Sequence, residues 1–270
     1  MLSGFSSKGA SVSVAPFALW VLLLFSHNLL AAACPARETS ERVTVVHVFD
    51  GDTVKLADGR RLRLIGINAP ELRPDGPDHE PFADQAKAAL QSIIERNNRT
   101  LLLQYDREHQ DHYGRLLAHA FTESGENIAV RLLAGGLATT LVVPPNGWSH
   151  DCYQQQENRA RIERRGIWDH PRYQAQDSRE LAASTRGFAL VYGTVQRVRQ
   201  AGGTLWLEFE GPLSVRIGKQ DQVNFPHGQL ERLVGEAVEI RGWVRSKPSG
   251  LVMTVRHPAA LTIISSTHAP

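Results

Sequence analysis

The stretch FDGDTVKLADGRRLRLIGINAPE, at residues 49–71, decides how the first half of the chain folds. Apolar and polar residues alternate on both sides of a central Asp-Gly pair, which is a strong signal for the two-residue turn of a β-hairpin. In the second strand, the alternation places Leu62 and Leu64 on one face and Arg63 on the other. The stretch therefore predicts a hairpin with a charged side chain projecting from one strand.

Two acidic residues open this stretch. Asp50 and Asp52 flank Gly51, which allows the backbone to turn tightly and to bring both carboxylates together. Carboxylates so close repel each other unless a cation or a shared proton relieves them. Oxygen ligands without a nearby cysteine or histidine suit calcium, and magnesium less well. The triplet is also common in surface turns, so a metal site and a plain turn both stay open.

Other residues complete the parts of a phosphodiester-hydrolysing site. The Arg63 guanidinium is either a buried ion-pair partner or a group that recognises planar anions. Pro70 restricts the direction of Glu71, and the motif DHYGRLL places Tyr113 and Arg115 where a loop enters a strand. In such hydrolysis a metal neutralises phosphate, a carboxylate activates or orients water, and guanidinium groups stabilise the developing charge. Surface salt bridges explain these residues about equally well at this point.

The order of elements predicts a mainly β fold with helices. Residues 42–67, 100–106, 116–122 and 139–147 read as extended, and residues 83–97, 127–138 and 151–168 have helical patterns. This order predicts a small β-barrel with helices packed on it, in a domain at residues 34–172. A polar linker is expected at residues 173–186. Short β runs return at residues 187–270, which predicts a second small β-barrel of the oligonucleotide-binding (OB) type.

The N-terminus has the marks of a secretory signal. A basic start and an apolar stretch precede Ala31, Ala32 and Ala33, where a signal peptide of residues 1–33 would be cleaved. The alternatives are a retained membrane anchor and lipid attachment at Cys34, and both are disfavoured by the short apolar run and the poor acylation signal. We therefore expect an exported protein, periplasmic or extracellular, with no stable membrane span after cleavage.

The chain has two cysteines, Cys34 and Cys152. In an oxidising compartment we expect them to pair and to tie the new N-terminus to the segment around residue 152. The alternative is two unrelated free thiols.

The overall charge excludes one class of nucleic-acid binder. With 30 basic and 28 acidic residues the net charge is only +2, whereas a protein that holds long duplexes by phosphate contacts alone is usually far more basic. Binding of a polyanion must therefore be local.

The motifs DGDTVKL, RLRLIGINAPE, DHYGR and the later GLA…GIW resemble, in order and spacing from Val43 to Trp168, the staphylococcal nuclease-like (thermonuclease) family. The resemblance implies an OB-fold five-stranded barrel with three helices, and calcium-dependent cleavage of DNA, RNA or both. It assigns phosphate binding to Arg63 and Arg115, and the role of general base, or alternatively of orienting water, to Glu71.

The resemblance also implies further ligands. Asp52 is the metal aspartate, with Asp50 as an outer contributor, and Tyr113 contacts the substrate phosphate. The family's second metal carboxylate is replaced by Asn68, whose carbonyl oxygen, with the backbone carbonyl of Ala69, could still reach calcium. One negative charge is lost, so we expect weaker cation affinity.

The aromatic residues that hold the nucleotide base in this family are also missing. Leu141 and Val143 stand where tyrosines are expected, which places base stacking in doubt. Four tryptophans are interpreted as core or domain-contact residues rather than a stacking platform: Trp148, Trp168, Trp206 and Trp243.

Two other patterns have plain interpretations. His109 and His112 are close together but have no cysteine partner, so we interpret most histidines as surface residues rather than zinc ligands. The arginines of residues 159–165 alternate with Glu157 and Glu163, which we interpret as paired, solvated charge on one helix.

The sequence thus predicts a metal-dependent endonuclease. The alternatives are a non-catalytic nucleic-acid-binding module and a protein-interaction domain of the cell envelope, for which the sequence indicates no protein partner. Retention of Asp52, Arg63, Glu71 and Arg115 together favours the enzyme, because a pure binder has no need for all four.

Overall fold

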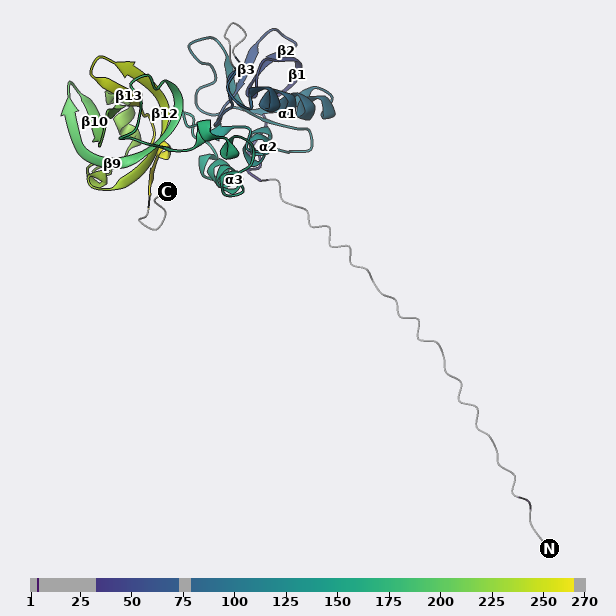
Figure 1. The fold of residues 1–270 in the computed structure, drawn as a ribbon. Helices are drawn as coiled ribbons and strands as arrows, with labels where there is room; N and C mark the ends of the chain where they lie inside the picture. Colours follow the sequence, from purple (N-terminus) through teal and green to yellow (C-terminus); the bar gives the residue numbers. More distant parts are fainter. Residues whose placement is uncertain (1–3, 5–32, 73–78, 265–270) are drawn as a thin grey trace. The chain divides into compact units, whose positions relative to one another are not determined.

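The computed structural model describes Gly4, residues 33–72 and residues 79–264. Its first part is a closed barrel in which neighbouring strands follow the order β1-β2-β3-β6-β5 (Figure 1). These strands are β1 Glu41–Val48, β2 Thr53–Leu56, β3 Arg61–Leu64, β5 Thr100–Gln104 and β6 Leu116–Phe121. Only the pair β3–β6 among them is parallel. The predicted five-stranded barrel is confirmed.

The hairpin of β2 and β3 forms, but its turn is longer than the predicted two residues. Lys55 pairs with Arg61, and the amide of Leu56 donates to the carbonyl of Arg60, so residues 57–59 form the loop. Gly59 adopts a positive φ of 91°, and Asp58 Oδ1 accepts a hydrogen bond from the amide of Arg60 at 2.9 Å, which closes the turn. Leu62 and Leu64 are buried in the barrel core, and Arg63 projects to the other face. The alternation therefore sets which side chains reach the site.

Gly51 lies in a bend of the backbone at residues 50–52, as the sequence predicts, and glycine is also required there for space. It is not among the residues with positive φ. A Cβ atom there would lie 2.6 Å from the Cβ of Ala69 and 2.7 Å from that of Ala86, closer than real Cβ contacts allow. Glycine therefore lets the segment of Asp50 and Asp52 pack directly against these two alanines.

In the part of the chain that the structure describes, three α-helices accompany the barrel, as predicted: α1 Ala83–Arg96, α2 Ile128–Ala134 and α3 His150–Ile162 (Figure 1). The apolar residues that repeat at helical spacing along α1 are buried: Ala86, Leu90, Ile93 and Ile94. A short pairing of β4 Ile67–Asn68 with β7 Thr139–Thr140 holds the segment after the hairpin against the segment after α2. This pairing brings residues 67–71 and 139–147 to one side of the barrel.

The second part of the chain is a seven-stranded sheet in the order β14-β12-β13-β11-β10-β9-β8. Its strands are β8 Gln176–Asp177, β9 Gly187–Ala201, β10 Thr204–Phe209, β11 Leu213–Ile217, β12 Ala237–Lys247, β13 Gly250–Thr254 and β14 Leu261–Ile263. Strand β12 also pairs with β9, so five strands join in the ring β9-β10-β11-β13-β12. The five strands of this ring neighbour one another in the same chain order as those of the first barrel. The parallel pair β11–β13 in the ring corresponds to the parallel pair β3–β6 in the barrel.

The predicted linker, residues 173–186, contains β8 and several buried side chains, among them Ser178 and Leu181. A single turn of 3-10 helix, Glu231–Leu233, precedes β12. The proposed domain boundaries remain a prediction.

Cys34 and Cys152 are joined by a disulfide, as predicted, and Cys34 is buried in the first core. Apart from Gly4 and Ala33, the predicted signal segment lies outside the described residues. Among the residues that the structure describes, no helix is long and apolar enough to cross a membrane.

Candidate active site

Arg63 is an ion-pair partner in this structure. Its Nη2 lies 3.0 Å from Oδ2 of Asp52, and only 13% of its side chain is exposed. A second donor, Nη1, is hydrogen-bonded to the carbonyl of Leu64. The antiparallel pairing of β2 with β3 sets Thr53 opposite Arg63, and this register brings the aspartate beside the guanidinium.

Asp52 is a buried carboxylate with fixed neighbours. Its Oδ1 accepts the hydroxyl of Thr53 at 3.0 Å, and its Oδ2 accepts the amide of Ala69 at 2.8 Å. Burial raises the pKa of Asp52 to about 7; Arg63 opposes the rise, and the nearby Asp50 adds to it. The raised pKa means that the negative charge of Asp52 is unfavourable in its buried place. A bound cation would stabilise this charge, whereas a proton would remove it.

Glu71 is solvent-exposed as a residue, but it also lines the pocket described below. The partial loss of water raises the pKa of its carboxyl, and repulsion from Asp50 raises it further, whereas Arg63 and Arg115 oppose the rise. A carboxyl with a raised pKa is better suited to proton transfer near neutral pH than an ordinary glutamate.

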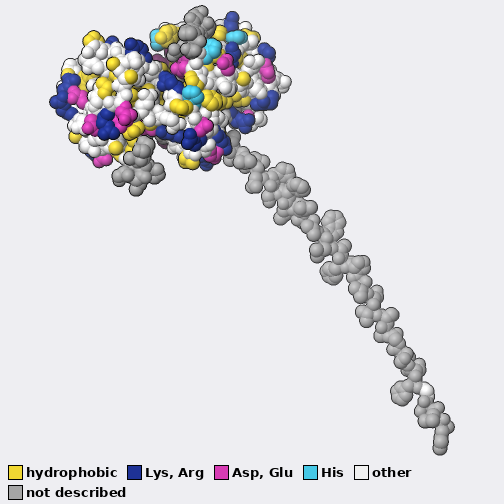
Figure 2. Space-filling model, in the orientation of Figure 1, with side chains coloured by type: hydrophobic (Ala, Val, Ile, Leu, Met, Phe, Trp, Pro, Cys, Tyr) yellow, Lys and Arg dark blue, Asp and Glu magenta, His cyan; other side chains and the backbone are white. Residues whose placement is uncertain are grey.

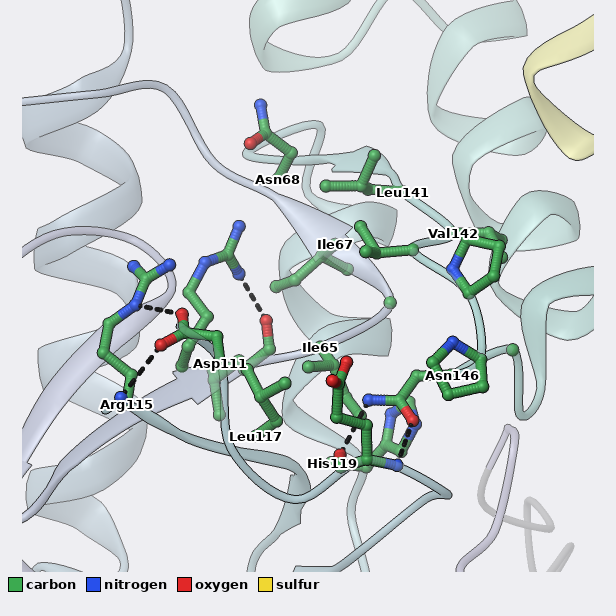
Figure 3. A pocket seen from close by; sticks show the side chains of 18 of the residues that line it. Ile65, Ile67, Asn68, Asp111, Arg115, Leu117, His119, Leu141, Val142 and Asn146 are labelled. Carbon is green, nitrogen blue, oxygen red and sulfur yellow. Dashed lines mark hydrogen bonds and ion pairs between the residues drawn. The ribbon is translucent and has the colours of Figure 1, made fainter. Parts of the chain in front are cut away.

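Arg115 is positioned by Asp111, a residue that the sequence reasoning did not single out. Asp111 Oδ2 accepts a bond from Arg115 Nε at 2.7 Å, and Oδ1 accepts the amides of Tyr113 and Arg115, each at 2.9 Å (Figure 3). Such local turns are typical of aspartate, so its place in DHYGR was the available signal. Tyr113 is 73% exposed, with its ring 5.5 Å from the guanidinium carbon of Arg115.

The candidate metal ligands are close without forming a complete site. Asp50 Oδ1 accepts a hydrogen bond from the amide of Asp52 at 2.9 Å. Asn68 is buried, and its backbone carbonyl accepts a hydrogen bond from the hydroxyl of Thr139 at 3.3 Å. It is the amide of Ala69, not its carbonyl, that contacts Asp52. Among the described residues, no three His, Cys, Asp or Glu side chains gather as a metal site. The all-oxygen donors and the mutual repulsion of Asp50, Asp52 and Glu71 still fit a hard divalent cation.

A cavity of about 680 Å³ brings most of the predicted residues together (Figure 3). It is lined by the five predicted site residues Arg63, Asn68, Glu71, Tyr113 and Arg115. Asp50, Asp52 and Ala69 are not among its lining residues. Its size falls in the usual range for ligand sites.

One wall of this cavity is aliphatic. Figure 3 shows Ile65, Ile67, Leu117, Leu141 and Val142 around it, and the prolines of residues 144–145 complete this wall. This wall includes Leu141 and Val143, whereas the aromatic residues Tyr113, Trp148 and Trp243 line the pocket elsewhere.

Two lining residues come from the second part of the chain, Trp243 and Arg256. Arg256 Nη2 donates to the carbonyl of Pro144 at 3.4 Å, and its Nε is bonded to Asp221 at 3.0 Å. No local motif marks these residues, because their place depends on the packing of the two parts.

The charged run on α3 corrects another expectation. Glu157 is fully buried rather than solvated, and it is bonded to Arg241 of β12 at 2.8 Å.

On the face of the molecule that Figure 2 shows, basic and acidic side chains are intermixed, in agreement with local rather than extended binding of a polyanion.

Comparison with known proteins agrees with this geometry. Residues 61–170 match the family described as Staphylococcal nuclease homologue. The chain is 34% identical over 133 residues to the Thermonuclease of Staphylococcus intermedius, a match that covers 48% of this chain and 77% of that protein. An Uncharacterized endonuclease of Escherichia coli O157:H7 is 28% identical over 157 residues, 55% of this chain and 86% of that protein.

Endonuclease YhcR of Bacillus subtilis is 28% identical over 148 residues, 51% of this chain but only 12% of that protein. The family match ends before β9, so it does not extend to the second sheet. The chain therefore belongs to the family of staphylococcal nuclease homologues, and it carries the domain of a phosphodiester-hydrolysing nuclease.

Proposed function

We propose that this chain is an exported, calcium-dependent endonuclease that hydrolyses phosphodiester bonds of DNA, RNA or both. The observation that carries the proposal is the convergence of Arg63, Arg115 and Glu71 on one cavity. Two guanidinium groups and a carboxyl of raised pKa are the parts that phosphodiester hydrolysis requires.

Each residue has a role that follows from its contacts. Arg115, oriented by Asp111, and Arg63 bind the phosphate and stabilise the charge that develops on its oxygens. Glu71 accepts a proton from the attacking water or orients that water, and Tyr113 contacts the phosphate. The pairing of Arg63 with Asp52 holds the guanidinium ready at the pocket wall.

Calcium is the proposed cofactor. Asp52 would hold it, with help from Asn68, the carbonyl of Ala69 and, in the outer shell, Asp50. When bound, the cation supplies charge neutralisation for the phosphate. The missing carboxylate at Asn68 predicts weaker binding than an aspartate would provide.

Export is supported by the disulfide, because disulfides persist mainly in oxidising compartments. The Cys34 sulfur cannot be in a disulfide and also carry a lipid, so the disulfide supports a free periplasmic or extracellular protein. In this proposal a signal peptide of residues 1–33 precedes a nuclease domain of residues 34–172, a linker of 173–186 and a β domain of 187–270.

The test is an assay with single- and double-stranded DNA and RNA, with added calcium or with a chelator. We expect internal cleavage with calcium and none with chelator. Cleavage unaffected by chelation would overturn the metal dependence. Binding without cleavage under all conditions would instead indicate a non-catalytic nucleic-acid-binding module.

A further inference from the structure

Strand β12 of the second sheet packs against the nuclease domain. Its side chains alternate between the core of the second sheet and the nuclease domain. Val238, Ile240 and Val244 point into the core of the second sheet. Because side chains alternate along a strand, Glu239, Arg241 and Trp243 lie on the opposite face.

The first two of these outward residues are bonded to helix α3. Glu239 Oε1 accepts a bond from Arg161 Nη1 at 2.7 Å. Arg241 Nη1 lies 2.8 Å from both carboxylate oxygens of Glu157 and 2.9 Å from Oγ1 of Thr140. The Arg241 and Glu157 side chains are only 9% and 1% exposed, so this face of β12 is packed against the nuclease domain.

The third residue, Trp243, lines the catalytic pocket. It follows Arg241 by two positions, about 7 Å along the strand. Its ring meets Phe188 of β9 edge-on at 5.3 Å, and 42% of the residue remains exposed. An exposed indole, held from one side and open to a cavity, is unusual for a residue that serves only as core.

An exposed aromatic ring in this pocket provides a surface on which a nucleotide base can stack. The pocket wall at residues 141–145 is aliphatic and offers no flat π surface for a base. Trp148 also lines the pocket, and its ring is engaged in edge contacts with His119, Phe121 and Tyr153. Tyr113 contacts His112 and Arg115, beside the proposed phosphate site. An indole is the largest aromatic surface that a protein can offer to a nucleotide base.

We propose that Trp243 stacks on an unpaired base of the substrate, so that the second β domain completes the substrate site of the nuclease domain. The proposal rests on the nuclease function proposed above and extends it to a substrate class, single-stranded DNA or RNA. A base in a duplex is already stacked between its neighbours, whereas an unpaired base exposes a π face to an aromatic side chain.

The test measures binding without turnover. The full chain carrying Glu71→Gln is titrated, with calcium present, into a fluorescein-labelled oligothymidylate, and affinity is read from fluorescence anisotropy. Adding Trp243→Ala is expected to weaken binding about tenfold, in line with the usual contribution of base stacking. Trp243→Phe keeps an aromatic face and should lose much less.

The matched control is Trp206→Ala. Trp206 lies in the same domain on β10, is half-buried beside Arg199, and does not line the pocket. This variant should bind with unchanged affinity. A second control is an oligonucleotide of abasic sites, for which the Trp243→Ala variant should equal its parent, because no base is present to stack.

The outcomes separate the two proposals. Unchanged affinity of Trp243→Ala for oligothymidylate, or an equal loss for the abasic strand, overturns the stacking role. If the chain with Glu71 intact cleaves no substrate, the nuclease function is overturned instead. The binding measurement does not depend on cleavage, so it tests the stacking role separately.

Discussion

Nη2 of Arg63 lies 3.0 Å from Oδ2 of Asp52, so a guanidinium proposed to bind phosphate is already held by a buried carboxylate. The two proposed functions, phosphate binding and metal binding, are therefore coupled through one contact. A cation that draws the charge of Asp52 to itself would leave Arg63 free to bind the substrate.

Replacing Arg63 tests this coupling. Arg63→Ala should lower kcat/KM about 100-fold or more, since it removes a preorganised donor to the transition state. Arg63→Lys keeps the charge but not the planar fork and should recover only part of this loss. Arg42→Ala is the control, because Arg42 is 65% exposed and pairs with Glu123 at the surface. Turnover close to wild type for Arg63→Ala would contradict the assignment.

Glu71→Gln removes the proposed base without removing volume. We expect a loss of turnover of about 100-fold or more, the usual range for positioned acid–base groups. The unfolding midpoint should not fall, because the substitution removes a negative charge that burial and Asp50 disfavour. Glu123→Gln, a surface carboxylate outside the pocket, should keep full activity, and equal activity of the two variants would sink the role of Glu71.

Asn68→Asp should restore a metal carboxylate. We expect calcium to bind about tenfold more tightly in isothermal titration, the equivalent of about 1.4 kcal/mol. The cation-free protein should lose stability, because the new charge joins Asp50, Asp52 and Glu71. Asn98→Asp, at an exposed position beyond α1, provides the control. No change in affinity would mean that residue 68 is not a ligand.

His119 should make the fold sensitive to mild acid. It is buried and bonded to the hydroxyl of Tyr153 at 2.9 Å, and burial lowers its pKa from 6.5 to about 4. Below pH 6.5 the unfolded chain takes up a proton that the folded chain refuses, so stability falls as the pH falls from 6.5 toward 4. Between pH 6.5 and 5 this loss is about 2 kcal/mol.

The measurement is chemical denaturation of wild type and His119→Gln at both pH values. The variant should lack this part of the pH dependence, while other titrating groups act alike in both proteins. His109→Gln, at an exposed position, should behave as wild type. An identical slope for wild type and His119→Gln would show that His119 is not held neutral.

The Arg241–Glu157 pair should be essential to the packing of β12 on α3. Arg241→Met leaves the buried Glu157 charge unpaired and should cost about 3–5 kcal/mol of unfolding free energy. The double variant Glu157→Gln with Arg241→Met should recover part of this loss. Arg197→Met, in an exposed pair with Glu208, should cost less than about 1 kcal/mol. An equal, small effect of Arg241→Met and Arg197→Met would refute the argument.

Much of the nuclease domain could be predicted because its signals are local. The period-two alternation around Asp58-Gly59 specifies the hairpin, and the periodic apolar face of α1 specifies that helix. The candidate residues Arg63, Glu71 and Arg115 could be named because they lie in short contiguous motifs that resemble those of the family. Glu157 could not, because its partner is 84 residues away and its helix otherwise reads as solvated.

By itself the sequence determined the barrel and the three helices, since their signals are short-range periodicity and turn chemistry, and its two cysteines allow one pairing. The catalytic side chains remain a prediction from the resemblance of its motifs to the family. Only the tertiary structure decided that Gly51 is needed for space, that Arg63 is paired with Asp52, and that Trp243 enters the pocket. These facts depend on distances between segments far apart in the chain, and such distances are set by packing and register rather than by neighbouring residues.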